Sequence, residues 1–181
     1  SSDPAQIYDL PPFGNVSLLH FTDCHAQLLP VYFREPSVNI GLGEAFGRVP
    51  HRVGSYFLDH FSIPRSSPEA YAYTCLDFES MAQKFGKVGG FAHLATLIKR
   101  IKASRPHSLL LDGGDTLQGS ATALWTQGRD MIGASKLLGV DIMTGHWEFT
   151  YGMERVRAII DGELDPIEFL AQNVVLTEDA A

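Results

Sequence analysis

Three short segments of the sequence carry carboxylate and imidazole groups in types and spacing that suit a metal site. Asp23 and His25 are separated by one residue, Asp115 follows two glycines, and His146 follows another glycine. Imidazole nitrogens and carboxylate oxygens bind divalent transition metals, and a bound cation can activate water for hydrolysis. Each segment alone is also common in ordinary turns. The metal interpretation therefore depends on the segments meeting in space.

Hydrophobic patterning predicts that each of these segments follows a buried strand. Short apolar runs indicate strands at Val16–Phe21, Ser108–Leu111 and Val140–Thr144. Apolar residues at helical spacing predict connecting helices at residues 91–101, 121–127, 129–138 and 153–160. A last strand is predicted at Gln172–Val175. This alternation favours an α/β fold with a mainly parallel sheet, in which the carboxyl ends of the strands share one edge. The candidate ligands would then gather at that edge.

Residues 30–88 break this alternation. They are rich in proline, glycine, serine and aromatic residues and show no sustained periodicity. So many large apolar groups argue for an ordered insertion rather than a flexible tether, because disordered linkers contain few of them. Long insertions in compact domains are commonly functional. We nevertheless favour packing over docking as the role of these aromatic side chains.

Composition excludes several classes of partner. The chain has 181 residues, 45% of them hydrophobic, and a formal charge of −7, with its Lys and Arg residues scattered. Such a chain suits one soluble globular domain and gives no basic face for nucleic acid. No run approaches the roughly 20 apolar residues of a membrane helix. Cys24 and Cys75 permit one disulfide or two free thiols, and we expect free thiols.

The segments at 23–25, 113–120 and 145–152 together resemble the SoxB thiosulfohydrolases, a family within the 5′-nucleotidase superfamily of dinuclear metallophosphoesterases. The resemblance runs from about Asn15 to Asn173. It implies a metallophosphoesterase-like layered αββα sandwich, of which residues 1–181 form the N-terminal part of the catalytic domain. The C-terminal substrate-binding domain and three later histidines of that family have no counterpart here. We therefore expect the isolated fragment to be inactive.

The resemblance also implies a pair of divalent cations. Manganese is the expected metal and zinc is the competitor. The implied ligands are Asp23, His25, Asp115 and His146, with Asp115 as the natural bridge because a shared carboxylate offsets the repulsion between two cations. In an extended segment, Asp23 and His25 would point the same way and Cys24 would point away from the metals. Gln118 and Asn173 match family positions and are expected to support the site rather than to bind metal.

The segment 145–152 departs from phosphate-ester-cleaving relatives at decisive positions. His146 replaces a metal-binding Asn, Trp147 replaces the catalytic His, and Thr150 replaces the Asp that orients that His. A general acid assists the departure of a poor alkoxide leaving group, whereas a sulfur leaving group needs it far less. Trp147, Glu148 and Thr150 are thus candidates for lining the substrate pocket or orienting its groups. Glu148 is expected to orient neighbours rather than to bind metal.

The implied reaction is the hydrolysis of a cysteine S-thiosulfonate on the carrier protein SoxYZ by metal-activated hydroxide. It releases sulfate in bacterial thiosulfate oxidation, and the family works in the periplasm. A start at Ser1-Ser2-Asp3-Pro4 would suit removal of an export signal. Two alternatives stay open: a 5′-nucleotidase or related phosphoesterase, and a non-catalytic domain that binds a partner through the aromatic insertion.

Overall fold

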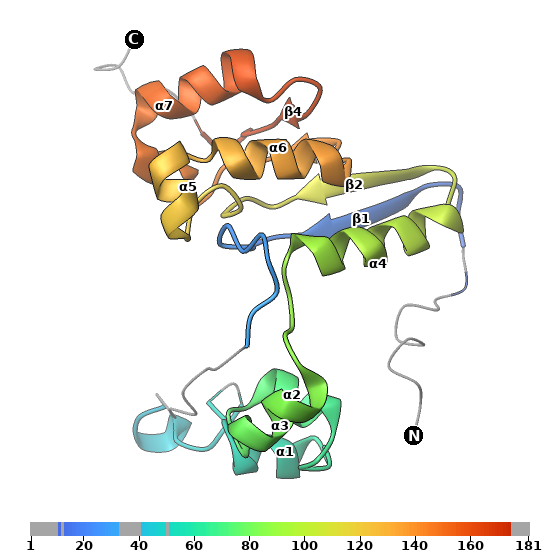
Figure 1. Cartoon of the computed structure of the whole chain (residues 1–181), viewed down its shortest axis with the longest axis vertical. Helices are drawn as coiled ribbons and strands as arrows, with labels where there is room; N and C mark the ends of the chain where they lie inside the picture. The colour runs from blue at the N-terminus through green and yellow to red at the C-terminus, as the bar shows by residue number, and fades with distance from the viewer. Residues whose placement is uncertain (1–10, 12, 33–40, 50, 175–181) are drawn as a thin grey trace. The chain divides into compact units, whose positions relative to one another are not determined.

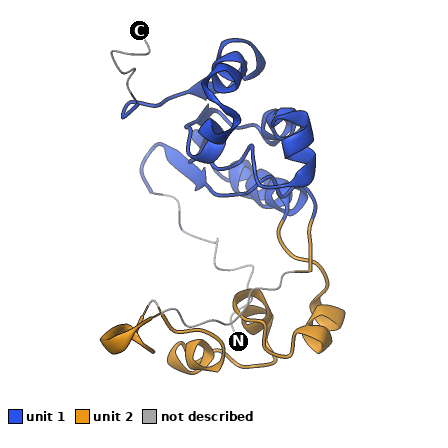
Figure 2. Ribbon diagram, turned by 90° about the vertical axis from the view of Figure 1, so that its left-hand side faces the viewer, with its two compact units in different colours: residues 1–29, 90–181 blue, residues 30–89 orange. Residues whose placement is uncertain are grey.

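The chain forms two compact units (Figure 2). The computed structural model describes residues 11, 13–32, 41–49 and 51–174. One unit is Pro30–Gly89, close to the bounds of the insertion 30–88, and the other combines Ser1–Leu29 with Gly90–Ala181. The candidate ligands all belong to the latter, which we call the sheet unit. The expected trimmed start at residues 1–4 lies outside the described residues.

A four-stranded parallel sheet organises the sheet unit (Figure 1). Its strands are β1 (Ser17–Phe21), β2 (Ser108–Asp112), β3 (Ile142–Met143) and β4 (Glu168–Phe169), in the order β1-β2-β3-β4. All neighbouring pairs are parallel, with Phe21 opposite Asp112 and Asp112 opposite Met143. The predicted α/β class with parallel strands is confirmed, and the first three predicted strands are found within their expected bounds, β2 extending one residue further.

Helices connect the strands, as the sequence pattern predicted. They are α4 (Phe91–Ala103), α5 (Ala121–Thr126), α6 (Arg129–Leu138), the 3-10 helix η3 (Trp147–Tyr151), α7 (Met153–Ala158) and the π-helical turn η4 (Ile159–Glu163). Ser120 begins α5 by accepting a hydrogen bond from the amide of Ala123, which satisfies one of the free amides of the first turn. Gly139 ends α6 in a left-handed conformation, which glycine adopts without strain.

The predicted strand Gln172–Val175 is wrong. The fourth strand is Glu168–Phe169, Gln172 and Asn173 lie in a turn, and Val175 is outside the described residues. The apolar side chains that fill the core come earlier than the valine pair. Ile167 is buried and Phe169 packs against the core, whereas Val174 is half exposed.

The core lies on one face of the sheet. Leu19, Leu110 and Met143 share that face and pack in one cluster with residues of α4, α5 and α6. On the opposite face, the exposed fractions are 64% for Leu18 and 40% for Leu109. The second sheet expected of a full αββα sandwich is not among the described residues.

The described residues of the unit Pro30–Gly89 form short helices with their own aromatic packing. The unit contains the 3-10 turn η2 (Gly43–Ala45) and the helices α1 (Ser55–His60), α2 (Pro68–Tyr73) and α3 (Phe78–Phe85). Tyr71 is buried, its ring lies 6.2 and 5.9 Å from those of Phe78 and Phe85, and its hydroxyl donates to the carbonyl of Gly86. None of the helices in the described ranges of either unit has the length and apolar character of a membrane span.

Candidate metal centre

The loops that follow β1, β2 and β3 meet at the carboxyl edge of the sheet. Hydrogen bonds continue past the strands and tie the first two loops together. Asp23 donates its amide to the carbonyl of Gly114 at 2.9 Å, and His25 donates its amide to the carbonyl of Asp115 at 2.9 Å. The third loop joins through Thr144, whose amide donates to the carbonyl of Asp112 at 3.0 Å. These backbone hydrogen bonds fix the positions from which the candidate side chains project.

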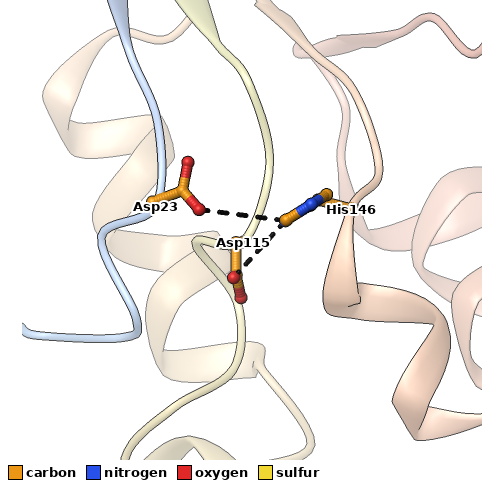
Figure 3. A group of neighbouring side chains, drawn as sticks. All are labelled: Asp23, Asp115 and His146. Atoms are coloured by element: carbon orange, nitrogen blue, oxygen red, sulfur yellow. Dashed lines mark ion pairs between the residues drawn. The ribbon is translucent and has the colours of Figure 1, made fainter. Parts of the chain in front are cut away.

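Asp23, Asp115 and His146 form a group that could hold a metal ion (Figure 3). One donor atom from each lies within 4.8 Å of the others. His146 Nδ1 is 3.4 Å from Asp115 Oδ2 and 3.9 Å from Asp23 Oδ1. The fourth predicted ligand, His25, places Nε2 3.7 Å from the same Oδ2 of Asp115. The other three side chains therefore converge on Asp115, with His25 beside the tight group of three.

The donor set fits divalent transition metals. Asp115 is buried, with a side chain 1% exposed, whereas the side chains of Asp23, His25 and His146 are about half exposed. A buried carboxylate surrounded by one further carboxylate and two imidazoles offers both the oxygen and the nitrogen donors that manganese and zinc accept.

Three of the four candidate ligands adopt a backbone conformation that side chains rarely tolerate. Asp23, His25 and Asp115 have φ angles of 55°, 48° and 56°. Left-handed conformations at residues other than glycine concentrate at functional sites, where the surrounding structure enforces them. The predicted extended conformation of residues 23–25 is therefore wrong. The hydrogen bonds to the β2 loop bend this segment, and both side chains still reach Asp115.

Cys24 faces the interior between the two ligands of its loop. Its side chain packs against the hydrophobic core, and its sulfur is not in a disulfide. Burial, and next the negative charge of Asp112, raise the pKa of this thiol to about 11. A thiol with so high a pKa is a poor nucleophile at neutral pH. Cys75 is likewise not in a disulfide.

Glu148 accepts four backbone amides and is 2% exposed. Its Oε1 accepts hydrogen bonds from Thr116 (2.8 Å) and Leu117 (3.1 Å). Its Oε2 accepts from Asp115 (3.1 Å) and His146 (2.8 Å). Both oxygens are thus occupied by amides of the ligand loops. These contacts agree with a role in orienting neighbours, and that role stays a prediction.

Asp112 is a buried carboxyl group that sequence reasoning did not single out. Its Oδ1 accepts hydrogen bonds from the amide of Gly114 at 3.0 Å and the hydroxyl of Thr116 at 2.8 Å. Its Oδ2 is buried with no hydrogen-bond partner among the described residues. Burial raises the pKa of this group to about 6. The only signal in the sequence was its place two residues before Gly114, where an Asp commonly accepts the amide of a tight turn.

The remaining predicted residues take different places. Trp147 is exposed, and its ring meets that of His146 edge-on with centroids 6.3 Å apart. Gln118 Nε2 donates to Asp115 Oδ1, which makes it a direct support of the central carboxylate. Thr150 donates its hydroxyl to the carbonyl of Trp147 at 2.7 Å and so stabilises the 3-10 turn. Asn173 lies in the turn beyond β4.

Known proteins resemble the chain in structure over most of its length and in sequence over nearly half of it. No protein-family model matches the chain. The solved structure of the sulfate thiohydrolase SoxB of Thermus thermophilus in complex with glycerol is 38% identical, with a TM-score of 0.75 over 91% of this chain. The 5′-nucleotidase of Bos taurus is 39% identical over 83 residues, 45% of this chain, and the snake venom 5′-nucleotidase of Gloydius brevicauda is 38% identical over 80 residues, 44% of this chain.

These relatives are much longer than the chain. The matched part is 31% of the SoxB chain, 14% of the bovine protein and 12% of the snake venom protein.

Proposed function

Because the chain belongs to the metallophosphoesterase superfamily of the 5′-nucleotidases and SoxB, we propose that it is the metal-binding N-terminal part of a thiosulfohydrolase. The proposed substrate is a cysteine S-thiosulfonate on a carrier protein. Water adds its oxygen to the terminal sulfonate sulfur, and the bond between that sulfur and the middle (sulfane) sulfur breaks, with its electron pair staying on the sulfane sulfur. Sulfate and the two protons of the water are released, and the cysteine keeps the sulfane sulfur as a persulfide. The similarity to SoxB supports this choice, because it extends over twice as much of the chain as the similarity to the nucleotidases.

The residues at the sheet edge would hold two divalent cations. When bound, such a pair lowers the pKa of a water molecule and polarises an oxygen of the substrate. Asp23, His25, Asp115 and His146 would hold the two cations. We propose manganese, with zinc as the competitor. Imidazole at position 146, where phosphoesterases carry an amide, shifts the donor set toward transition metals.

The proposal of a thiosulfonate rather than a phosphate ester as substrate rests on the position of Trp147. Its exposed indole stands beside His146, where a phosphoesterase of this superfamily would carry its general acid. Thr150 turns its hydroxyl back to the carbonyl of Trp147, and Glu148 is buried beneath the loops. This segment therefore presents no titratable acid beside the candidate ligands. A sulfur leaving group, which departs as a stable anion, does not require one.

The whole activity belongs to a longer protein. We propose that further histidine ligands and a substrate-binding domain complete the site, because this chain corresponds to 31% of the SoxB chain. The proposed carrier is SoxYZ and the proposed compartment is the periplasm, both carried over from the similarity to SoxB.

Sulfate release by the full-length protein tests this proposal. The protein, treated with chelator and then supplied with Mn²⁺, is mixed with the carrier bearing a cysteine-bound thiosulfonate, and sulfate is measured by ion chromatography. AMP is supplied in a parallel reaction. We expect metal-dependent sulfate release and no AMP hydrolysis. AMP hydrolysis without sulfate release would assign a 5′-nucleotidase instead. Neither reaction together with no metal binding would assign a non-catalytic binding domain.

A further inference from the structure

We infer that Glu148 is a positioning residue that fixes the separation of Asp115 and His146 and thereby sets the affinity of the site for metal. The inference rests on the metal-dependent hydrolysis proposed above. It concerns a side chain that touches neither a metal nor a substrate in that proposal. Its carboxylate acts instead through the backbone of the two ligand loops.

Each oxygen of Glu148 has a separate role. Oε2 accepts the amides of Asp115 and His146, so a single atom joins the backbones of two candidate ligands that are 31 positions apart in the sequence. Oε1 accepts the next two amides of the β2 loop, those of Thr116 and Leu117. The side-chain distance that results is 3.4 Å between Asp115 Oδ2 and His146 Nδ1. Few side chains other than a carboxylate could satisfy four donors at once.

The β2 loop needs such an acceptor. Asp115, Thr116 and Leu117 are all at most 2% exposed, so water cannot satisfy their amides. A buried amide without a partner costs about 1–3 kcal/mol. The loop is also bent into the left-handed region at Asp115, which is unfavourable for any residue with a side chain. The three hydrogen bonds from these amides to Glu148 offset these costs and hold Asp115 in the conformation that directs its carboxylate at both histidines.

Glu148→Gln keeps the size of the side chain but reduces the number of hydrogen bonds that it can accept. The amide side chain has the same shape, but its NH₂ group cannot accept a hydrogen bond. Whichever way it is turned, two of the four amides lose their acceptor and face another donor. Removing a group that orients metal ligands typically weakens metal binding about 10- to 100-fold. We expect a loss of Mn²⁺ affinity in that range.

Asp141→Asn is the matched control. Asp141 Oδ2 accepts the amide of Leu110 in β2 at 2.7 Å and lies 3.5 Å from Lys102 Nζ. It is therefore another carboxylate that accepts a backbone amide of the same sheet, but it contacts no candidate ligand. This variant should lower the melting temperature of the metal-free protein and leave its Mn²⁺ affinity within about twofold of wild type, since no ligand-orienting group is removed.

The experiment is Mn²⁺ titration calorimetry on the metal-free, full-length protein, with thermal unfolding of each variant alongside. We expect Glu148→Gln to bind Mn²⁺ about 10- to 100-fold more weakly and to regain activity as Mn²⁺ is raised. Wild-type affinity in this variant, or a loss of thermal stability alone as in Asp141→Asn, would overturn the inference. If Glu148→Gln does not fold, Glu148→Asp takes its place. It keeps both acceptor oxygens on a shorter stem and should show weaker Mn²⁺ binding, whereas unchanged binding would overturn the inference.

The Mn²⁺ affinity measured by calorimetry does not depend on which substrate the protein cleaves. A wild-type protein that binds Mn²⁺ but releases no sulfate would refute the proposed reaction and leave the role of Glu148 measurable. Sulfate release with equal Mn²⁺ affinities in wild type and Glu148→Gln would refute the role of Glu148 alone.

Discussion

Asp115 shows how a single side chain can be prepared for binding before any ligand arrives. Gln118 donates to one carboxylate oxygen, which fixes the rotation of the group. The other oxygen faces His25 and His146 at 3.7 and 3.4 Å. The carboxylate is buried, so water competes little for either oxygen. Little rearrangement is then required when a cation enters, which favours tight binding.

The proposal that Trp147 stands in place of a general acid leads to a prediction about the leaving group. Restoring the phosphoesterase pair in the full-length protein, by Trp147→His combined with Thr150→Asp, should give no gain in kcat/KM for the thiosulfonate. The sulfur leaving group departs without a proton, whereas an alkoxide benefits from one. Steady-state rates with the carrier-bound thiosulfonate and with AMP measure both effects. A tenfold or larger gain with the thiosulfonate would contradict this account, and Thr150→Asp alone serves as the control.

Asp112 leads to a prediction about pH. Its pKa is raised from 3.8 to about 6 in the folded protein, chiefly by burial. The folded state thus holds the proton more tightly than the unfolded state, and stability falls as pH rises between about 4 and 6 and stays lower above. At 1.36 kcal/mol per pKa unit, the full effect is about 3 kcal/mol.

Asp112→Asn removes that titration. The gain in the free energy of unfolding relative to wild type should grow by about 2 kcal/mol from pH 4 to pH 7, in urea denaturation of the metal-free protein. Comparing the two proteins at each pH cancels the other titrating groups. A difference that is constant with pH would show that the carboxyl group of Asp112 does not titrate in this range.

At the scale of elements, the loop after β2 is fitted to the loop after β3 with no room for an extra atom. A Cβ on Gly114 would lie 2.9 Å from the Cβ and the backbone nitrogen of His146, and 2.9 Å from the carbonyl oxygen of Thr144. The φ of Gly114 is also +90°. Backbone atoms cannot move aside without moving the loop itself.

Gly114→Ala should therefore destabilise the protein by about 2–4 kcal/mol and weaken Mn²⁺ binding by moving His146 away from Asp115. Gly139→Ala is the control, because Gly139 also has a positive φ, +81°, but open space around its Cα. It should cost only about 1–2 kcal/mol and leave Mn²⁺ affinity unchanged. Urea denaturation and calorimetry give the two quantities. Equal metal affinities in both variants would show that the close approach of the loops does not position His146.

The sequence predicted the positions of helices and strands better than the conformations of the loops. Apolar periodicity was enough to predict β1, β2 and the helices that flank them, because burial on one face dictates those patterns. It failed at the fourth strand, where a two-residue pairing at Glu168–Phe169 leaves almost no pattern. It also failed at residues 23–25, because their bend is imposed by hydrogen bonds to a loop 90 residues away. The acceptor role of Glu148 depends on such distant amides as well, and only its type and neighbourhood suggested it.

At the scale of the whole molecule, the described ligands are too few for a pair of cations. Four side chains converge at the sheet edge, while manganese prefers about six donors for each ion. We therefore predict that the 181-residue chain binds Mn²⁺ at least about 10-fold more weakly than the full-length protein, for which we have proposed further histidine ligands. Calorimetry on both proteins measures the ratio. Equal affinities would mean that the four side chains suffice for all the metal that binds.

Val31 and Val88 lie one residue inside the two ends of the unit Pro30–Gly89, next to the points where the chain leaves and re-enters the sheet unit. Their backbones pair in both directions, at 3.0 and 2.8 Å, and the amide of Phe91 donates to the carbonyl of Gln27 at 3.1 Å just beyond them. The ends of the intervening segment are thus held side by side, and closing a loop of any length between such ends costs little additional entropy. In the gene, the codons of these two valines therefore mark the ends of a segment that can change independently of the sheet unit. Between the two codons, whole stretches could be lengthened, lost or exchanged during evolution without shifting a single ligand.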